Sequence, residues 1–128
     1  LVTGVQTCAL PISEEDLFEI GYANNALESA VALAKLSVNA GAKAIVCSPL
    51  EIASIRSAIG PDIEIITPGV RPISDSKGDD QKRTMTPSDA INAGASLLVI
   101  GRPITSAWKD GAAAMSARAR SIAEEILK

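Results

Sequence analysis

The chain has 128 residues, of which 47% are hydrophobic, so it is long enough for one globular domain with a buried core. Its net charge of −3 and isoelectric point near 4.9 argue against the basic surface of a nucleic-acid-binding protein. An aromatic content of 2% leaves few stacking surfaces for single strands. The sequence contains no apolar run near the roughly 18–20 residues of a membrane span and no signal-peptide pattern, so we expect a cytoplasmic protein.

Cys8 and Cys47 are the only cysteines, and the sequence contains no histidine. Two thiols are too few ligands for a zinc site, and a nucleophile activated by histidine is excluded as well. A disulfide between the two cysteines remains open, but one pair in an alanine-rich chain favours reduced thiols in the cytosol. Cys47 lies within an apolar run, which favours a core residue over a nucleophile.

The predicted elements alternate between short apolar strands and helices. In chain order we expect a strand at Leu1–Thr3, a helix from Ser13 to Ile20, a helix over Asn25–Ala40, a strand at Ala44–Cys47, a helix from Ser48 to Ile59, a strand at Ile63–Thr67, a helix over Pro87–Ala93, a strand at Leu97–Ile100, a helical turn after Pro103, and a helix over Asp110–Leu127. The last helix carries an apolar stripe formed by Met115, Ala119, Ile122 and Ile126.

The helix boundaries carry recurring signals. Ser13, Ser48 and Thr86 each precede a predicted helix and have an acidic residue three positions later, which is typical of an N-terminal cap. The triplets Ala40-Gly41-Ala42 and Ala93-Gly94-Ala95 both separate a helix from an apolar run. This repetition indicates a chain built from successive strand–helix units.

The pattern predicts an α/β fold with a parallel sheet. Because the strands are continuous apolar runs, we expect both faces of the sheet to be covered. Leu33 and Leu36 are expected to widen the apolar face that the Asn25–Ala40 helix packs on the sheet. A full (β/α)₈ or TIM barrel needs about 250 residues, so this chain would form roughly half of one.

Two predicted strands end at turns that contain glycine, proline and one arginine. Arg71 follows the Ile63–Thr67 strand, and Gly101 and Arg102 follow Leu97–Ile100. Ligands of α/β folds bind where strands end, and guanidinium and backbone N–H groups suit phosphate. Gln81, on the long loop between the two strands, could bridge a phosphate and a base. The alternative is that both arginines are solvated loop residues and that Gly101 serves only a tight turn.

Four blocks of sequence match a known family in order. Thr67-Pro68-Gly69-Val70-Arg71-Pro72, Gly78-Asp79-Asp80-Gln81-Lys82-Arg83, Met85-Thr86-Pro87 and Val99-Ile100-Gly101-Arg102-Pro103-Ile104-Thr105 resemble the C-terminal half of bacterial-type orotidine 5′-phosphate decarboxylase. The resemblance extends from about Ser13 to the C-terminus. It implies a TIM barrel that is a homodimer at full length. It also implies conversion of orotidine monophosphate to UMP with loss of CO₂, without a cofactor or metal.

The resemblance also assigns roles to individual residues. It implies that Gly101 and Arg102 bind the substrate phosphate, and that Gln81 contacts both phosphate and pyrimidine. Arg71 would belong to the same phosphate end of the site. The phosphate site predicted from the residues would thereby gain a nucleotide ligand.

The chain departs from the family pattern in two places. The catalytic Asp-x-Lys-x-x-Asp core of the family belongs to its N-terminal half, to which the resemblance does not extend, so no catalytic residue is assigned and the fragment alone is expected to be inactive. Leu1–Ile12 does not match the strand that should precede the Ser13 helix. We interpret it as an atypical, in part spurious, segment joined to a half-barrel over residues 13–128. The alternative function is a non-catalytic half-barrel that binds phosphorylated ligands or associates with itself.

Overall fold

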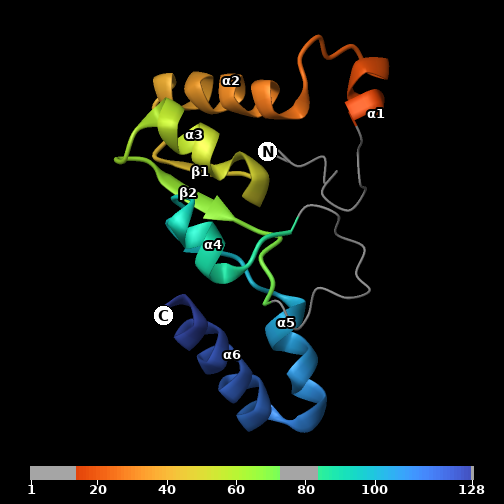
Figure 1. Cartoon of the computed structure of the whole chain (residues 1–128), viewed down its shortest axis with the longest axis vertical. Helices are drawn as coiled ribbons and strands as arrows, with labels where there is room; N and C mark the ends of the chain where they lie inside the picture. The colour runs from red at the N-terminus through yellow and green to blue at the C-terminus, as the bar shows by residue number, and fades with distance from the viewer. Residues whose placement is uncertain (1–13, 73–83, 128) are drawn as a thin grey trace.

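The computed structural model describes residues 14–72 and 84–127 (Figure 1). The predicted strand at Leu1–Thr3 and the cap at Ser13 lie outside these residues, as does the loop segment that carries Gln81. None of the described helices is both long and apolar enough to cross a membrane. In chain order the elements are α1 (Glu14–Glu19), α2 (Ala26–Asn39), β1 (Ala44–Val46), the 3-10 helix η1 (Pro49–Glu51), α3 (Ile52–Ile59), β2 (Glu64–Thr67), α4 (Pro87–Asn92), β3 (Leu97–Leu98), α5 (Arg102–Thr105), the 3-10 helix η3 (Ser106–Asp110) and α6 (Ala112–Ile126).

The three strands form one parallel sheet in the order β1-β2-β3. Ala44 pairs with Glu64 at one end of the β1–β2 ladder, and Ile66 pairs with Leu97 between β2 and β3. The backbone N–H of Val99 donates to the Thr67 carbonyl at 2.9 Å, which continues the contact beyond the short β3. This arrangement confirms the predicted α/β fold and matches part of a TIM barrel, although β3 is shorter than the predicted strand at Leu97–Ile100.

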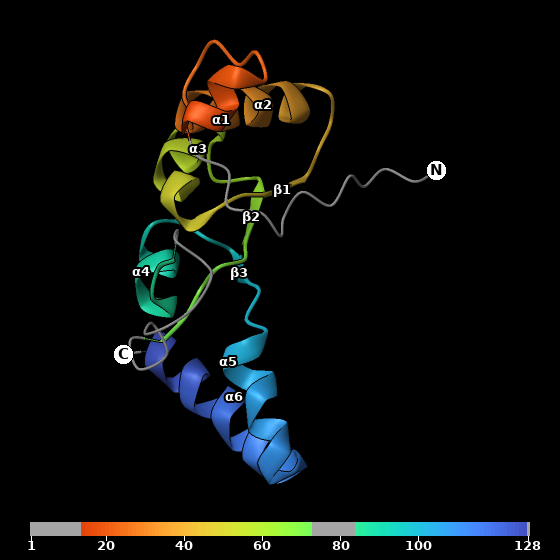
Figure 2. The ribbon, with the colours of Figure 1, turned by 90° about the vertical axis from the view of Figure 1, so that its right-hand side faces the viewer.

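One face of the sheet carries the hydrophobic core. Figure 2 shows α3 and α4 on the same side of the strands. The buried cluster draws on three helices and the central strand, and its members are Ala34, Ile52, Ile55, Ile65, Val70, Ala90 and Ala95. Ile52 and Ile65 are 0% exposed, because the isoleucines of α3 pack directly over β2. The covering helices therefore pack on the outer side of a partial barrel.

The opposite face of the sheet is open among the described residues, so these residues do not cover both faces as the apolar runs predicted. The strand register places Val46, Ile66 and Leu97 on that face. Val46 is 68% exposed, and Leu97 is 55% exposed. The apolar runs predicted two buried faces because a whole barrel has them, whereas half a barrel supplies the outer helices without the opposing strands.

Leu33 and Leu36 are also exposed, at 54% and 65%, so they do not widen the packed face of α2 as predicted. The packed face is centred on Ala34, which is 3% exposed. The two leucines lie further around the helix, beyond the sheet edge formed by β1. Small residues let α2 approach the sheet closely, which leaves the longer side chains outside the contact.

The predicted helix caps have different outcomes. Thr86 accepts a hydrogen bond from the Asp89 N–H at 3.1 Å and donates to the Asp89 carboxylate at 2.6 Å, so the cap of α4 is confirmed. Ser48 makes no side-chain cap bond, and its hydroxyl is buried without a partner in the described structure. The predicted cap by the Ser48 side chain is therefore wrong. The Glu51 N–H that it needs is taken by the Ser48 backbone carbonyl at 3.1 Å, as the 3-10 geometry of η1 requires.

The repeated Ala-Gly-Ala triplets form identical helix ends. Gly41 and Gly94 have φ angles of 102° and 108°, a conformation that favours glycine. Each glycine N–H donates to a helix carbonyl at 2.9 Å, and the N–H of the following alanine reaches back one residue further at 3.0 Å. This is the Schellman arrangement, and it confirms the predicted repetition of strand–helix units.

The last helix folds back onto the preceding ones. Ile122 of α6 is 2% exposed, and the other members of the predicted stripe are half-buried. The Ser88 hydroxyl of α4 donates to the Glu125 carbonyl at 2.8 Å, and Arg118 Nε donates to the Pro103 carbonyl at 3.2 Å. Both contacts hold α6 against the segments that follow β2 and β3.

Candidate anion-binding site

The loops after β2 and β3 leave the sheet at the same end, the carboxyl end of the strands, because the two strands are parallel neighbours. After β2 the chain passes through Pro68 and Gly69, and Gly69 has a φ of 77°, a conformation that favours glycine. Val70 then pairs with Met85, and the Arg71 N–H donates to the Met85 carbonyl at 3.0 Å. The backbone of Arg71 is therefore held against the segment that leads into α4.

The Arg71 side chain is buried, with 7% of the residue exposed. Val70 beside it is 2% exposed, so this part of the loop belongs to the interior and not to the surface. A guanidinium retains its charge when buried and is retained there only with polar or charged partners. The burial argues against the alternative that Arg71 is an ordinary solvated loop residue.

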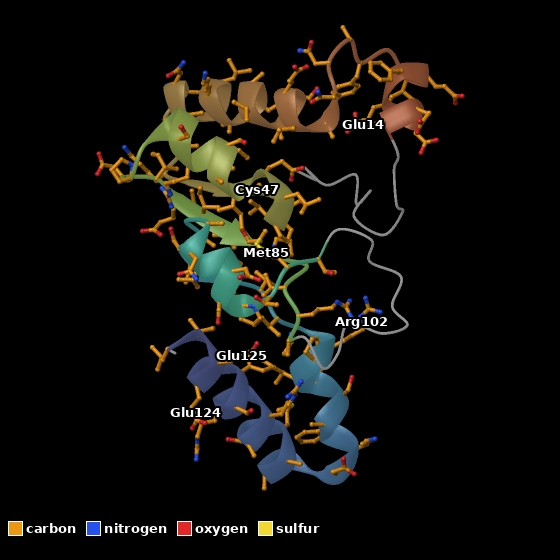
Figure 3. The ribbon with its side chains drawn as sticks, viewed as in Figure 1. Glu14, Cys47, Met85, Arg102, Glu124 and Glu125 are labelled. Carbon is orange, nitrogen blue, oxygen red and sulfur yellow. The ribbon has the colours of Figure 1, made fainter. Side chains whose placement is uncertain are left out.

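Gly101 and Arg102 lie where the chain passes from β3 into α5. The Gly101 carbonyl accepts the first bonds of this helix, from the N–H of Ile104 at 2.9 Å and of Thr105 at 3.0 Å. Arg102 is exposed, and Figure 3 shows its side chain extending from the start of α5 away from α6. Pro103 has no N–H, so anion binding at this turn would depend on the Gly101 and Arg102 amides and on the Arg102 guanidinium.

The space beside Gly101 is open. A Cβ atom built on this residue would meet no heavy atom within 4 Å, and the residue has a negative φ of −96°. Packing among the described residues therefore does not require glycine here, and the open backbone would allow a ligand to approach.

Three of the four predicted site residues can be placed in the structure. Arg71, Gly101 and Arg102 follow neighbouring strands at the carboxyl end of the sheet, as predicted. Gln81 lies outside the described residues. Arg71 is buried, whereas Gly101 and Arg102 are exposed, so the three residues differ in their exposure to solvent at this end of the sheet. Whether the four residues share one ligand stays a prediction.

Cys47 follows β1 at the same carboxyl end of the sheet and is half-buried (Figure 3). Burial raises the pKa of its thiol, while the neighbouring Thr67 side chain and the charge of Arg56 act in the opposite direction. A thiol that stays protonated is a poor nucleophile. This agrees with the interpretation of Cys47 as a core residue. The described residues contain no group of three or more potential metal ligands.

Sequence reasoning missed Arg56, whose guanidinium connects two loops at the opposite end of the sheet. Its nitrogens donate to the carbonyls of Gly60 at 2.8 Å, Ile63 at 2.6 Å and Gly94 at 2.8 Å. A further bond reaches the Ser96 hydroxyl at 3.1 Å. The available signal was a basic residue in the last turn of a helix, where side chains often bind free carbonyls.

The chain is similar to many known proteins. A model of the Orotidine 5'-phosphate decarboxylase / HUMPS family matches residues 12–117. The orotidine 5′-phosphate decarboxylase of Thermobifida fusca is 50% identical over 108 residues, which are 84% of this chain and 46% of that protein. The corresponding protein of Opitutus terrae is 46% identical over 114 residues, which are 89% of this chain and 49% of its own length. The chain thus spans about half the length of these curated relatives.

The structure agrees with this similarity. The crystal structure of orotidine 5′-phosphate decarboxylase from Lactobacillus acidophilus superposes with a TM-score of 0.67 and 35% sequence identity. The superposition covers 87% of this chain and 44% of that one. The parallel strands and outer helices described above therefore correspond to part of that barrel. Sequence and fold together show that the chain belongs to the orotidine 5′-phosphate decarboxylase / HUMPS family.

Proposed function

We propose that this chain forms the phosphate-binding half of an orotidine 5′-phosphate decarboxylase and takes part in converting orotidine monophosphate to UMP and CO₂. The observation that carries the proposal is the exposed Arg102, which directly follows Gly101 at the end of β3. The substrate class comes from the family and from the relatives that bear this name.

The chemistry of these residues suits a nucleotide phosphate. The planar guanidinium of Arg102 can bind two phosphate oxygens at once, and the open backbone at Gly101 allows a third oxygen to approach. Arg71 would add positive charge from the loop after β2. Gln81 would contact both the phosphate and the pyrimidine. The site grips the substrate far from the reacting carbon, which is how remote binding energy promotes catalysis.

The bond-breaking step would need residues from elsewhere. Loss of CO₂ leaves an electron pair on the pyrimidine carbon, and the family protonates that carbon with a lysine of its Asp-x-Lys-x-x-Asp core. This chain resembles only the C-terminal half of the family, and the one segment with the same spacing, Asp75-Ser76-Lys77-Gly78-Asp79-Asp80, falls between β2 and α4 in the sequence, so we do not assign it this role. We therefore propose that the chain alone has no decarboxylase activity and that it becomes active when joined to a half that supplies the lysine.

Complementation tests this proposal. The N-terminal half of the Thermobifida fusca relative is purified, mixed with this chain, and UMP formation is measured. We expect activity from the mixture and none from either half. The matched control is the same mixture made with Arg102→Ala, which should have much weaker apparent substrate binding. Two halves that are both folded by circular dichroism, yet produce no UMP together, would contradict the proposal.

The second candidate function is a non-catalytic half-barrel that binds phosphorylated ligands or associates with itself. It is favoured by the open apolar face of the sheet, on which Val46 and Leu97 are exposed. Calorimetric titration of the chain with UMP and with inorganic phosphate, together with its mass in solution, separates the two functions. Binding of both ligands with equal affinity, and no complementation, would favour the second candidate.

A further inference from the structure

The sheet has two edges that are complementary to each other. β1 forms one edge and β3 the other, and in the described part of the chain neither strand has a second neighbour. All three strands are parallel, so the outer edge of β3 could hydrogen-bond to the outer edge of another β1 in the same manner as β2 does. Unpaired edges of this kind are strong sites of association.

The open face of the sheet is apolar across all three strands. Val46, Ile66 and Leu97 form a row on it, and Val99 beyond β3 is 51% exposed. Glu64 at the amino end of β2 is the one charged residue of the strands. Parallel sheets are rarely left with a face in water, so this row needs a cover.

A groove runs along the outer edge of β1, beneath α2. It encloses about 420 Å³, and its walls include Ala30 and Leu33 of α2, Val46 of β1, and Ser48 and Glu51 beyond the strand. The buried Ser48 hydroxyl has no hydrogen-bond partner in the described structure. Buried hydroxyls are nearly always paired, so the groove lacks a polar partner as well as an apolar one. An added strand would supply both, the polar partner from its backbone and the apolar partner from its side chains.

Symmetry identifies a second copy of this chain as the occupant. A two-fold axis parallel to the strands keeps every strand parallel and sets β3 of each copy beside β1 of the other. Both junctions then form at once and no edge is left open, which is a closed cyclic arrangement. The same operation turns the two open faces toward each other and brings α6 next to Leu33 and Leu36 of the partner's α2. Two copies also match one relative in length, since one chain spans 46% or 49% of it.

We propose that two copies of this chain associate about such an axis, with β3 of each copy docked in the groove at β1 of the other. The proposal deepens the self-association named above as the second candidate function. It does not depend on phosphate binding. The interface consists of the two sheet edges, the row of Val46, Ile66 and Leu97, and the flank of α2.

The mass of the full chain in solution, measured by light scattering over a range of concentrations, tests the proposal. We expect twice the single-chain mass of 13.2 kDa, without larger species as concentration rises. Val46→Lys and Leu97→Lys each place a charge in the row and should yield the single-chain mass. The matched control is Ile20→Lys, which alters a residue of similar exposure, 67%, outside the sheet and should leave the pair intact. Circular dichroism verifies that each variant is folded, and Val46→Thr replaces Val46→Lys if the lysine variant is not.

The results divide clearly. A single-chain mass for the unsubstituted protein, or a series of ever larger assemblies, would overturn the closed pair. So would folded Val46 and Leu97 variants that pair as well as Ile20→Lys does. Arg102→Ala separates this proposal from the phosphate site, because it should weaken UMP binding while the mass remains that of a pair.

Discussion

Arginine occurs at both ends of the same sheet, in two different settings. At the amino end of the strands, Arg56 donates to backbone carbonyls of two loops and to Ser96. At the carboxyl end, Arg102 is exposed at the start of a short helix beside an open glycine. The comparison teaches that the partners of a guanidinium, and not its presence in a loop, indicate its role. Arg56 joins the loops at one end of the sheet, while at the other end Arg102 is the residue that we propose to bind a ligand.

The largest effect should come from the amino end. Arg56→Ala removes bonds to Gly60, Ile63 and Gly94 and leaves partly buried carbonyls unpaired. We expect the free energy of unfolding to fall by about 3 kcal/mol, as measured by urea denaturation. Arg56→Lys is the matched control, because it keeps the charge but cannot bind carbonyls of both loops at once, and it should lose most of the same stability. An unchanged urea midpoint in both variants would show that Arg56 has no structural role at the amino end of the sheet.

The second effect concerns the carboxyl end and should appear in binding, not in stability. Arg102→Ala is expected to weaken UMP binding by about thirtyfold, or about 2 kcal/mol, because a charge-assisted contact with the phosphate is lost. Its urea midpoint should stay near that of the unsubstituted chain. Calorimetric titration checks the first value and denaturation the second. A large loss of stability without a change in affinity would show that both ends of the sheet are structural.

The third effect shows that residues at the carboxyl end can also be structural. Thr86→Ala removes the cap of α4 and should cost about 1 kcal/mol of unfolding free energy. Ser48→Ala at the equivalent position after β1 removes a hydroxyl that caps nothing, so it should cost far less or increase stability. Parallel urea denaturation of the two variants measures the difference. Equal losses would mean that Ser48 has a partner after all.

The smallest effect concerns pH. Burial raises the pKa of Cys47 above the ordinary value of 9.0, so the fold favours the neutral thiol. This contribution to stability is fully present below pH 9.0. It is lost as the pH rises from 9.0 through the raised pKa of the folded thiol, because in that range the unfolded thiol ionises while the folded thiol stays protonated. Urea denaturation above pH 9.0 should therefore reveal a decline that is smaller in Cys47→Ala. An identical decline in both proteins would assign it to other groups.

Local signals predicted most of the elements. The cap at Thr86, the start of α2 at Asn25, whose side chain accepts the Glu28 N–H at 2.8 Å, and the two glycine-ended helices all depend on residues within a few positions. Contacts between distant residues were not predictable in this way. Arg56 binds Gly94, which lies 38 positions later, and no periodicity encodes that distance.

The open face and the candidate site illustrate the same limit. The apolar runs indicated burial correctly for a whole barrel, but a pattern within one strand does not reveal which neighbouring strands are supplied. The sequence correctly predicted that Arg71 and Arg102 lie at the same end of the sheet, because the carboxyl ends of parallel neighbouring strands lie together. The burial of Arg71 depends on the packing of Val70 and Met85, which no single stretch of sequence specifies.

The matching helix ends at Gly41 and Gly94 have a consequence for engineering. At each end, the N–H groups of the glycine and of the following alanine bind the last helix carbonyls, so local hydrogen bonds set the direction in which the chain leaves the helix, and Arg56 additionally binds the Gly94 carbonyl. A strand–helix segment bounded by two such ends is a cassette that could be duplicated or exchanged among relatives. Its junctions would already be compatible, since both leave the helix along the same path.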